Sequence, residues 1–224
     1  MRIFSQIEKY SRACLFMMQL FFFCGQILFD ALALSACISV YRKSRMRIFG
    51  VLSLWFASRF LTVSLSMIWS RGFDMNPIPI QNITTVVENT LFVYFCQLLI
   101  SRNWKIWKFI YAWSFIIFGI ECYLSNFADV VYNLTSLSYY VTVCGLLTRI
   151  MYKEKIPQDI LKYIYILFFF HMSVMIYIAN LAVIMSDYEL FVFTYPLVYV
   201  VYLTFDMLSI WYFRSYLKKE LKFE

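Results

Sequence analysis

The sequence CLFMMQLFFFCGQILFDALALSACISVY at residues 14–41 runs into RKSRMR at 42–47 and then into IFGVLSLWFASRFLTVSLSMIW at 48–69. The two flanking segments are almost entirely apolar and are 28 and 22 residues long. A hydrocarbon core about 30 Å thick needs roughly 20 apolar residues in a helix to cross it. Because the basic segment between them is short, the two segments predict an antiparallel pair of transmembrane helices.

The composition of the chain agrees with a membrane protein. Of its 224 residues, 62% are hydrophobic, 21% aromatic and only 15% charged. A soluble domain is nearer half apolar and a quarter charged, and one soluble core of this size does not hide so much apolar surface. The many aromatic residues exclude a disordered chain.

Five further apolar runs follow the first two, so we predict an all-α fold, a polytopic membrane bundle of seven transmembrane helices at residues 14–213. The predicted spans are Cys14–Tyr41, Ile48–Trp69, Ile83–Ser101, Phe109–Ser125, Leu134–Met151, Tyr163–Met185 and Leu190–Phe213. Residues 1–13 predict a short interfacial helix. Residues 214–224 predict a basic cytoplasmic tail.

The basic residues predict the orientation. The loops after the odd-numbered spans and the C-terminal tail hold 15 of the 20 Lys and Arg residues. Lys and Arg collect on the cytoplasmic side of a membrane. We therefore expect the N-terminus outside and the C-terminus inside, in the cytoplasmic (inner) membrane. The net charge of +7 then reports orientation and contact with the lipid bilayer, and needs no nucleic-acid partner.

Ionisable residues inside the predicted spans are candidate site residues, because such groups are costly in a membrane unless they are paired or hydrated. They are Asp30, Arg59, Glu88, His171 and Asp206. Glu121 and Asp129 are expected at the outer rim, without a special role.

The distance of each residue from the inner face of the membrane suggests how four of the candidates pair. Asp30 and Arg59 each lie about 16 Å from the inner face on neighbouring helices, and His171 and Asp206 each lie about 10–12 Å from it. Asp30 and Arg59 form either a structural pair or part of a polar site. His171 and Asp206 either pair as a pH-sensitive switch, or are a hydrogen-bonded core histidine and a hydrated carboxylate near the interface. Glu88 is either exposed to water at the interface or within reach of Arg59.

The last predicted span carries a polar stripe. Tyr195, Tyr199, Tyr202 and Asp206 are spaced four, three and four residues apart, so they share one helix face near Pro196. This face lines a ligand pocket or packs against neighbouring helices.

The sequence carries no signature of catalysis. It has one His and six Cys without a C-x-x-C pair, and it lacks phosphate-loop and nucleophile-elbow motifs. The last span has no Lys for a retinal Schiff base. We expect no enzyme activity, no cofactor and no metal.

Several stretches resemble a family of uncharacterised seven-helix membrane proteins of Bacteroidetes-type bacteria. The stretches are Asn76-Pro77-Ile78-Pro79 leading into Val86-Val87-Glu88-Asn89-Thr90-Leu91, Phe127 through Tyr132-Asn133-Leu134, Phe168-Phe169-Phe170-His171 with Ile176-Tyr177-Ile178, and Tyr195–Tyr212. Glu88 matches a feature of that family, whereas Arg59 departs from it. Relatives in this family are often encoded beside two-component signalling proteins, which implies a signalling-associated role.

Three functional hypotheses follow. The first is a sensory or signalling-accessory protein that binds a membrane-bound sensor kinase, another membrane protein or a small lipophilic ligand. The second is a proton- or ion-coupled transporter that uses the intramembrane Asp, Glu, Arg and His side chains; the sequence lacks the inverted repeat that is common in transporters. The third is an intramembrane enzyme acting on lipid, for which the sequence shows no nucleophile and base at a suitable spacing.

Overall fold

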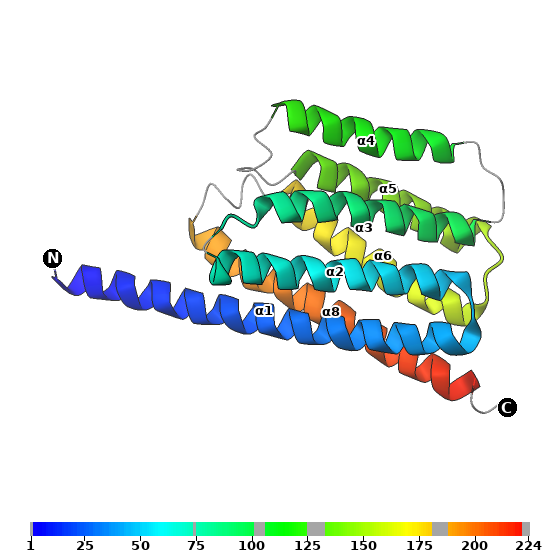
Figure 1. Cartoon of the computed structure of the whole chain (residues 1–224), viewed down its shortest axis with the longest axis horizontal. Helices are drawn as coiled ribbons and strands as arrows, with labels where there is room; N and C mark the ends of the chain where they lie inside the picture. The colour runs from blue at the N-terminus through cyan, green and yellow to red at the C-terminus, as the bar shows by residue number, and fades with distance from the viewer. Residues whose placement is uncertain (1, 74, 101–105, 125–132, 181–187, 221–224) are drawn as a thin grey trace.

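The structure is a computed structural model that describes residues 2–73, 75–100, 106–124, 133–180 and 188–220. All regular secondary structure in these segments is helical (Figure 1). The helices are α1 (Arg2–Ser44), α2 (Arg47–Gly72), α3 (Ile78–Leu99), α4 (Trp107–Leu124), α5 (Asn133–Lys153), α6 (Gln158–Ala179) and α8 (Tyr188–Glu220).

Each predicted span overlaps one of these helices, which confirms the all-α fold. Four segments of the described chain are long and apolar enough to cross a membrane: Leu20–Ser44, Arg47–Ser70, Gln158–Ala179 and Pro196–Lys219. The chain is therefore a membrane protein by the length and composition of its helices. The predicted end of the sixth span at Met185 lies outside the described residues, and α6 ends at Ala179.

Both predicted terminal segments belong mainly to long helices. Helix α1 continues without a break from Arg2 through the expected boundary at residue 13, and Figure 1 shows its N-terminal part extending beyond the other helices. Its 43 residues correspond to a length of about 65 Å. Helix α8 continues through Pro196 and includes most of the predicted tail up to Glu220.

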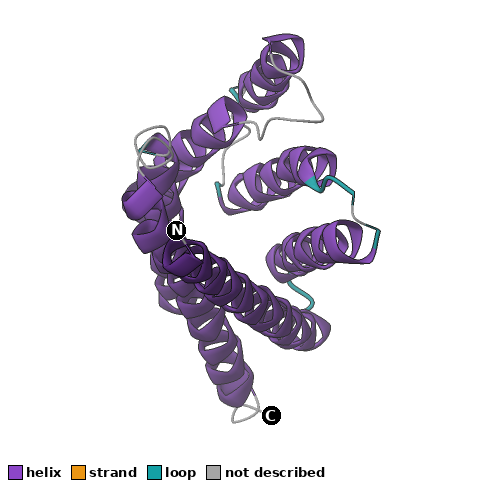
Figure 2. Cartoon of the chain, turned by 90° about the vertical axis from the view of Figure 1, so that its left-hand side faces the viewer, coloured by secondary structure: helices purple, strands orange, loops and turns teal. Residues whose placement is uncertain are grey.

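Six helices form a closed ring. Contacts join α1 to α2, α2 to α3, α3 to α5, α5 to α6, α6 to α8, and α8 back to α1. Helix α4 packs outside this ring against α3 and α5. Figure 2 views the helices nearly end-on. As a result, side chains from distant parts of the sequence face one another inside the ring.

The turn between α1 and α2 has a specific local cause. Arg45 has a φ of 54°, a left-handed conformation that commonly ends a helix, although glycine is usual there. Its backbone N–H donates to the Tyr41 carbonyl at 2.8 Å, and the N–H of Met46 donates to the Ser44 hydroxyl at 3.3 Å. These bonds stop α1 and reverse the chain within two residues.

Aromatic rings fill the interior of the ring. Phe49, Phe56, Phe92, Phe95 and Phe213 are among the largest fully buried side chains. Many of these rings meet edge to face, as Phe56 and Phe213 do with centroids 6.0 Å apart. Such contacts add to the stabilisation from packing alone, so the polar groups described next sit in a largely apolar surrounding.

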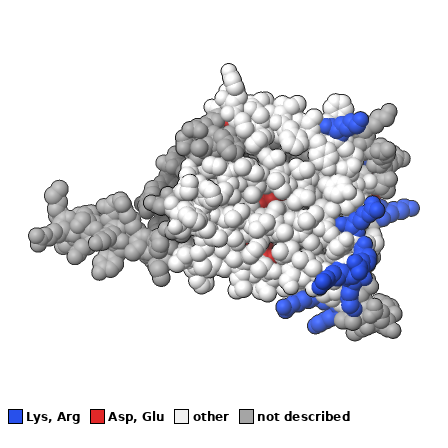
Figure 3. All heavy atoms as spheres, viewed as in Figure 1, with Lys and Arg blue, Asp and Glu red and all other residues white. Residues whose placement is uncertain are grey.

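Charge is distributed unevenly along the bundle. Figure 3 shows Lys and Arg side chains gathered at one end, where α1 turns into α2 and where α8 ends. The middle of the visible face is almost free of them. This distribution agrees with the charge pattern of the loops in the sequence.

Candidate functional site

Arg59 on α2 and Asp206 on α8 form a two-point ion pair inside the ring. Arg59 Nη1 donates to Asp206 Oδ1 at 3.0 Å, and Arg59 Nη2 donates to Asp206 Oδ2 at 3.3 Å. Parallel hydrogen bonds between a guanidinium and a carboxylate are among the strongest in proteins and also fix the orientation of both groups. The pair therefore holds α2 and α8 in one register.

Asp30 on α1 contacts the same guanidinium. Its Oδ1 lies 3.0 Å from Arg59 Nη2, which confirms the predicted pairing of Asp30 with Arg59. The exposed fractions are 0% for Asp30, 4% for Arg59 and 0% for Asp206. The three residues, here called the Arg59 cluster, join three helices and place two carboxylates around one permanent cation.

Five aromatic rings surround the Arg59 cluster. The Arg59 Cζ atom lies 5.1 to 5.7 Å from the ring centroids of Trp55, Phe56, Phe170, Tyr202 and Phe205. Aromatic faces attract a cation at such distances, and more so where water is excluded. The rings supply part of the stabilisation that water would give an exposed guanidinium.

Glu88 on α3 lies beside the cluster. Its Oε1 accepts a hydrogen bond from the Thr62 hydroxyl at 3.1 Å, and Thr62 lies one turn beyond Arg59 on α2. Glu88 is half-buried and interacts electrostatically with Arg59. The carboxylate is thus bound to α2 through Thr62, while Arg59 turns toward Asp30 and Asp206.

His171 is a hydrogen-bonded core residue, as one of the two alternatives predicted, and the alternative in which it pairs with Asp206 is wrong. Asp206 is fully buried, so the hydrated carboxylate expected with the core histidine is not found. His171 Nδ1 lies 2.7 Å from the Leu167 carbonyl, and its Nε2 lies 3.4 Å from the Tyr139 hydroxyl. A carbonyl only accepts, so Nδ1 carries the proton, and in the neutral ring Nε2 accepts from the Tyr139 hydroxyl. Helix α6 does pack against α8, but the permanent charge of Arg59 takes the Asp206 carboxylate.

The ring of His171 is a packing element. It is fully buried, and its centroid lies 4.3 Å from that of Phe92 on α3 and 6.1 Å from that of Trp55 on α2. His171 therefore joins α6 to α2, α3 and α5 beside the cluster.

The tyrosines of the polar stripe on α8 contact different neighbouring helices. The ring of Tyr199 stacks on Phe22 of α1 at 5.3 Å between centroids. The ring of Tyr202 packs beside Arg59 and meets Phe170 of α6 edge to face, with centroids 5.1 Å apart. The side chain of Tyr195 lies outside the described part of the structure. The two described members belong to helix contacts, which favours the packed-face alternative.

Glu121 has a role that the sequence analysis missed. Its two carboxylate oxygens accept the backbone N–H groups of Leu134 and Thr135, each at 2.7 Å, and the Thr135 hydroxyl also donates to it. These are free donors of the first turn of α5, where negative charge is favourable. The feature of the sequence that could have predicted this cap is an acidic residue near the end of one helix, shortly before the next helix begins. Asp129 lies outside the described residues.

Two grooves open on the surface of the bundle. One, of about 490 Å³, lies between α1 and α8 and is lined by residues that include Arg214 and Lys218. The other, of about 500 Å³, lies between α6 and α8 and is almost wholly apolar. The five ionisable candidates line neither groove. Within the described segments, His, Cys, Asp and Glu side chains form no group of three that could hold a metal ion.

No family model matches the chain, and no curated protein or solved structure is significantly similar to it.

Proposed function

We propose that this chain is a seven-span protein of the cytoplasmic membrane with a sensory or signalling-accessory role. In this role it binds a membrane-bound partner, such as a sensor kinase, or a small lipophilic ligand. The observation that carries the proposal is the Arg59 cluster, a buried and internally paired set of charges on three helices. A ligand or partner that moves one of these helices has to rearrange the same charges, so the cluster couples α1, α2 and α8.

The seven spans are supported by helix length. Helices α3, α4 and α5 have 22, 18 and 21 residues, close to the roughly 20 that a bilayer requires. They join the helices of the four apolar segments in the same bundle.

The basic end of the bundle is cytoplasmic in this proposal. A cysteine introduced as Ser44→Cys in the α1–α2 turn should label with an impermeant maleimide only after the cells are opened. The control is Met75→Cys in the loop between α2 and α3, which Figure 1 places at the opposite end and which should label in intact cells. Both variants need Cys24 and Cys122 replaced by Ser, since these thiols are exposed. The reverse labelling pattern would overturn the orientation.

The signalling role is supported by the burial and mutual pairing of the charged side chains. Polar residues of a transport pathway usually face a water-filled cavity. Here Asp30 and Asp206 are fully buried against Arg59. We also propose that the chain is related to seven-helix proteins encoded beside two-component proteins, which would fit the same role.

The alternative is a proton- or ion-coupled carrier. One specific observation favours it: three carboxylates, of Asp30, Asp206 and Glu88, stand around a single Arg59. Excess acidic groups within a membrane bundle are typical of proton relays.

One pair of experiments separates the two functions. The tagged protein is purified from native membranes in mild detergent, and the purified protein is also placed in liposomes with an internal pH dye. Signalling predicts that a sensor kinase is recovered, that its autophosphorylation changes when the protein is added back, and that Arg59→Gln alters this effect. The carrier predicts proton uptake that Asp206→Asn abolishes. A protein that purifies alone and moves protons would replace the first proposal by the second.

A further inference from the structure

We propose that the groove between α1 and α8 is a binding site for one anionic phospholipid of the leaflet at the basic end of the bundle. This inference does not depend on the proposed signalling role. It rests on the shape of the groove, on the division of its lining into an apolar part and a cationic part, and on its length.

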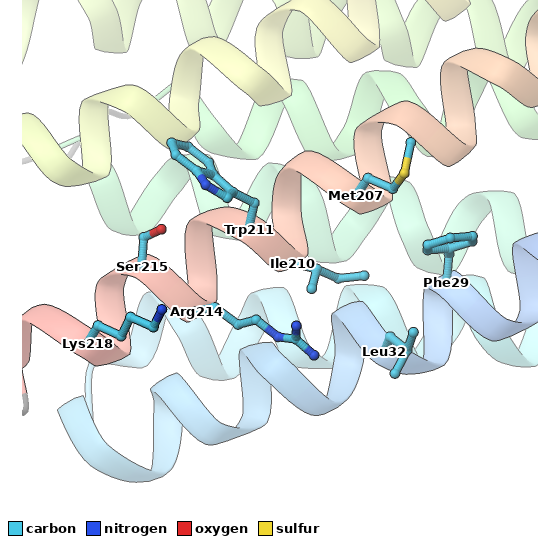
Figure 4. Close-up of a pocket in the computed structure, with 8 residues that line it drawn as sticks. All are labelled: Phe29, Leu32, Met207, Ile210, Trp211, Arg214, Ser215 and Lys218. Atoms are coloured by element: carbon cyan, nitrogen blue, oxygen red, sulfur yellow. The ribbon is translucent and has the colours of Figure 1, made fainter.

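The lining changes in character along the groove. Phe29 and Leu32 of α1 face Met207, Ile210 and Trp211 of α8. The last turns of α8 then add a cationic and hydroxyl-bearing part: Arg214, Ser215 and Lys218. Figure 4 shows this order, with Lys218 at one end of the groove and Phe29 and Met207 at the other. A phospholipid has the matching order, with a phosphate above its acyl chains.

The two cations are placed to act together. Arg214 and Lys218 are four residues apart on α8, so they lie on the same face one turn apart. Within the described residues neither one has an ion pair or a side-chain hydrogen bond, whereas the adjacent Lys219 is held by Asp159 at 2.6 Å. Their charges therefore remain available to an anion, and arginine suits the oxygens of a phosphate especially well.

The length of the groove fits one leaflet. From Met207 to Lys218 the α8 axis rises about 16 Å, which is about half of a hydrocarbon core of 30 Å. The cations stand at the end of the bundle where other basic side chains gather (Figure 3). A lipid whose phosphate contacts Arg214 and Lys218 would therefore extend its chains to mid-membrane, at Phe29 and Met207.

The apolar walls would be costly in water. Trp211 is 65% exposed, Met207 48% and Leu32 40%. Acyl chains in the groove cover this surface, and a tryptophan close to the headgroup region is common at membrane interfaces. An acidic peptide would satisfy the cations but would leave the deeper apolar part without a matching partner.

The test uses Trp211 as a reporter. The full-length protein is reconstituted in phosphatidylcholine vesicles that contain the same small mole fraction of brominated phosphatidylglycerol or of brominated phosphatidylcholine. Bromine quenches nearby indole rings, and the difference between wild type and Trp211→Phe isolates the contribution of Trp211. We expect the brominated anionic lipid to quench Trp211 several-fold more strongly than the zwitterionic lipid.

Two double variants identify the source of that preference. Arg214→Gln with Lys218→Gln should remove this several-fold preference, which lies below the limit of about 30-fold that two cations can supply at an anionic surface. Lys153→Gln with Lys155→Gln is the matched control, because it removes two exposed positive charges and should leave the preference unchanged. These residues lie at the end of α5 and just after it, and Figure 1 shows the connection from α5 to α6 at the same end of the bundle. Equal quenching by both lipids, or an equal loss in the control variant, would overturn the proposed site. All four positions are exposed, so the variants should fold.

Discussion

Replacing Arg59 by alanine should strongly destabilise the bundle. The substitution removes the cation that Asp30 and Asp206 share and leaves two carboxylates buried in an aromatic surrounding. Removing one partner of a buried ion pair typically costs about 3–5 kcal/mol, because the remaining charge is uncompensated. The five rings around the guanidinium also lose their cation, which adds to the loss.

The free energy of unfolding can be measured by titrating the protein from mild detergent micelles into dodecyl sulfate while following helicity. A loss of about 3–5 kcal/mol should also lower the thermal midpoint, by about 6–20 °C for a chain of this size. The matched control is Arg47→Ala on the same helix, since Arg47 is exposed at the start of α2. Its effect should stay within about 0.5 kcal/mol.

A neutral triple variant tests the cause of the loss. Asp30→Asn, Arg59→Met and Asp206→Asn together remove all three charges and keep similar volumes. The triple variant leaves no uncompensated buried charge, which is the main cost of breaking a buried ion pair, so it should be more stable than Arg59→Ala alone. Equal free energies of unfolding for Arg59→Ala and wild type would refute an electrostatic role for Arg59. A triple variant as unstable as Arg59→Ala would refute it as well.

Predictions for four further residues use the same unfolding titration. Asp206→Asn should cost about 2–3 kcal/mol, since it disrupts two charge-assisted hydrogen bonds. Asp30→Asn should cost less than about 1 kcal/mol, because it removes the surplus negative charge of the cluster; the opposite order would contradict the assigned contacts. His171→Phe should cost about 1–3 kcal/mol, because the aromatic packing is kept but the buried Tyr139 hydroxyl loses its hydrogen-bond partner. A loss larger than that of Arg59→Ala would indicate a charged role for this histidine. Glu121→Ala should cost about 1–2 kcal/mol, because it removes the carboxylate that caps α5. Glu121→Gln keeps one accepting oxygen and should cost less. Equal stability of wild type and Glu121→Ala would argue against the cap.

Part of the candidate site could be predicted because it depends on local spacing and depth. Asp30 and Arg59 lie at matching distances on either side of a short basic turn, and a hairpin of two helices leaves few alternative neighbours. Their pairing follows from helix rise and chain connectivity.

The pairing of Asp206 could not be predicted in this way. Depth alone made His171 an equally good partner, because α6 and α8 are neighbours as well. The decision depends on how each helix is rotated about its axis relative to all the others. The ring of helices turns Asp206 toward α1 and α2, and it turns His171 toward Tyr139 of α5 and Phe92 of α3.

The sequence by itself determined the class of protein, the approximate positions of the helices that the structure describes, the gathering of basic residues at one end and the ionisable groups worth examining. These depend on composition and on hydrophobic runs, which are properties of one segment at a time. Only the tertiary structure decided that Arg59 serves two carboxylates, that Glu121 caps α5, and that α1 and α8 leave a groove with a cationic end. Each of these depends on contacts between helices far apart in the chain, where rotation by a fraction of a turn changes which side chains meet.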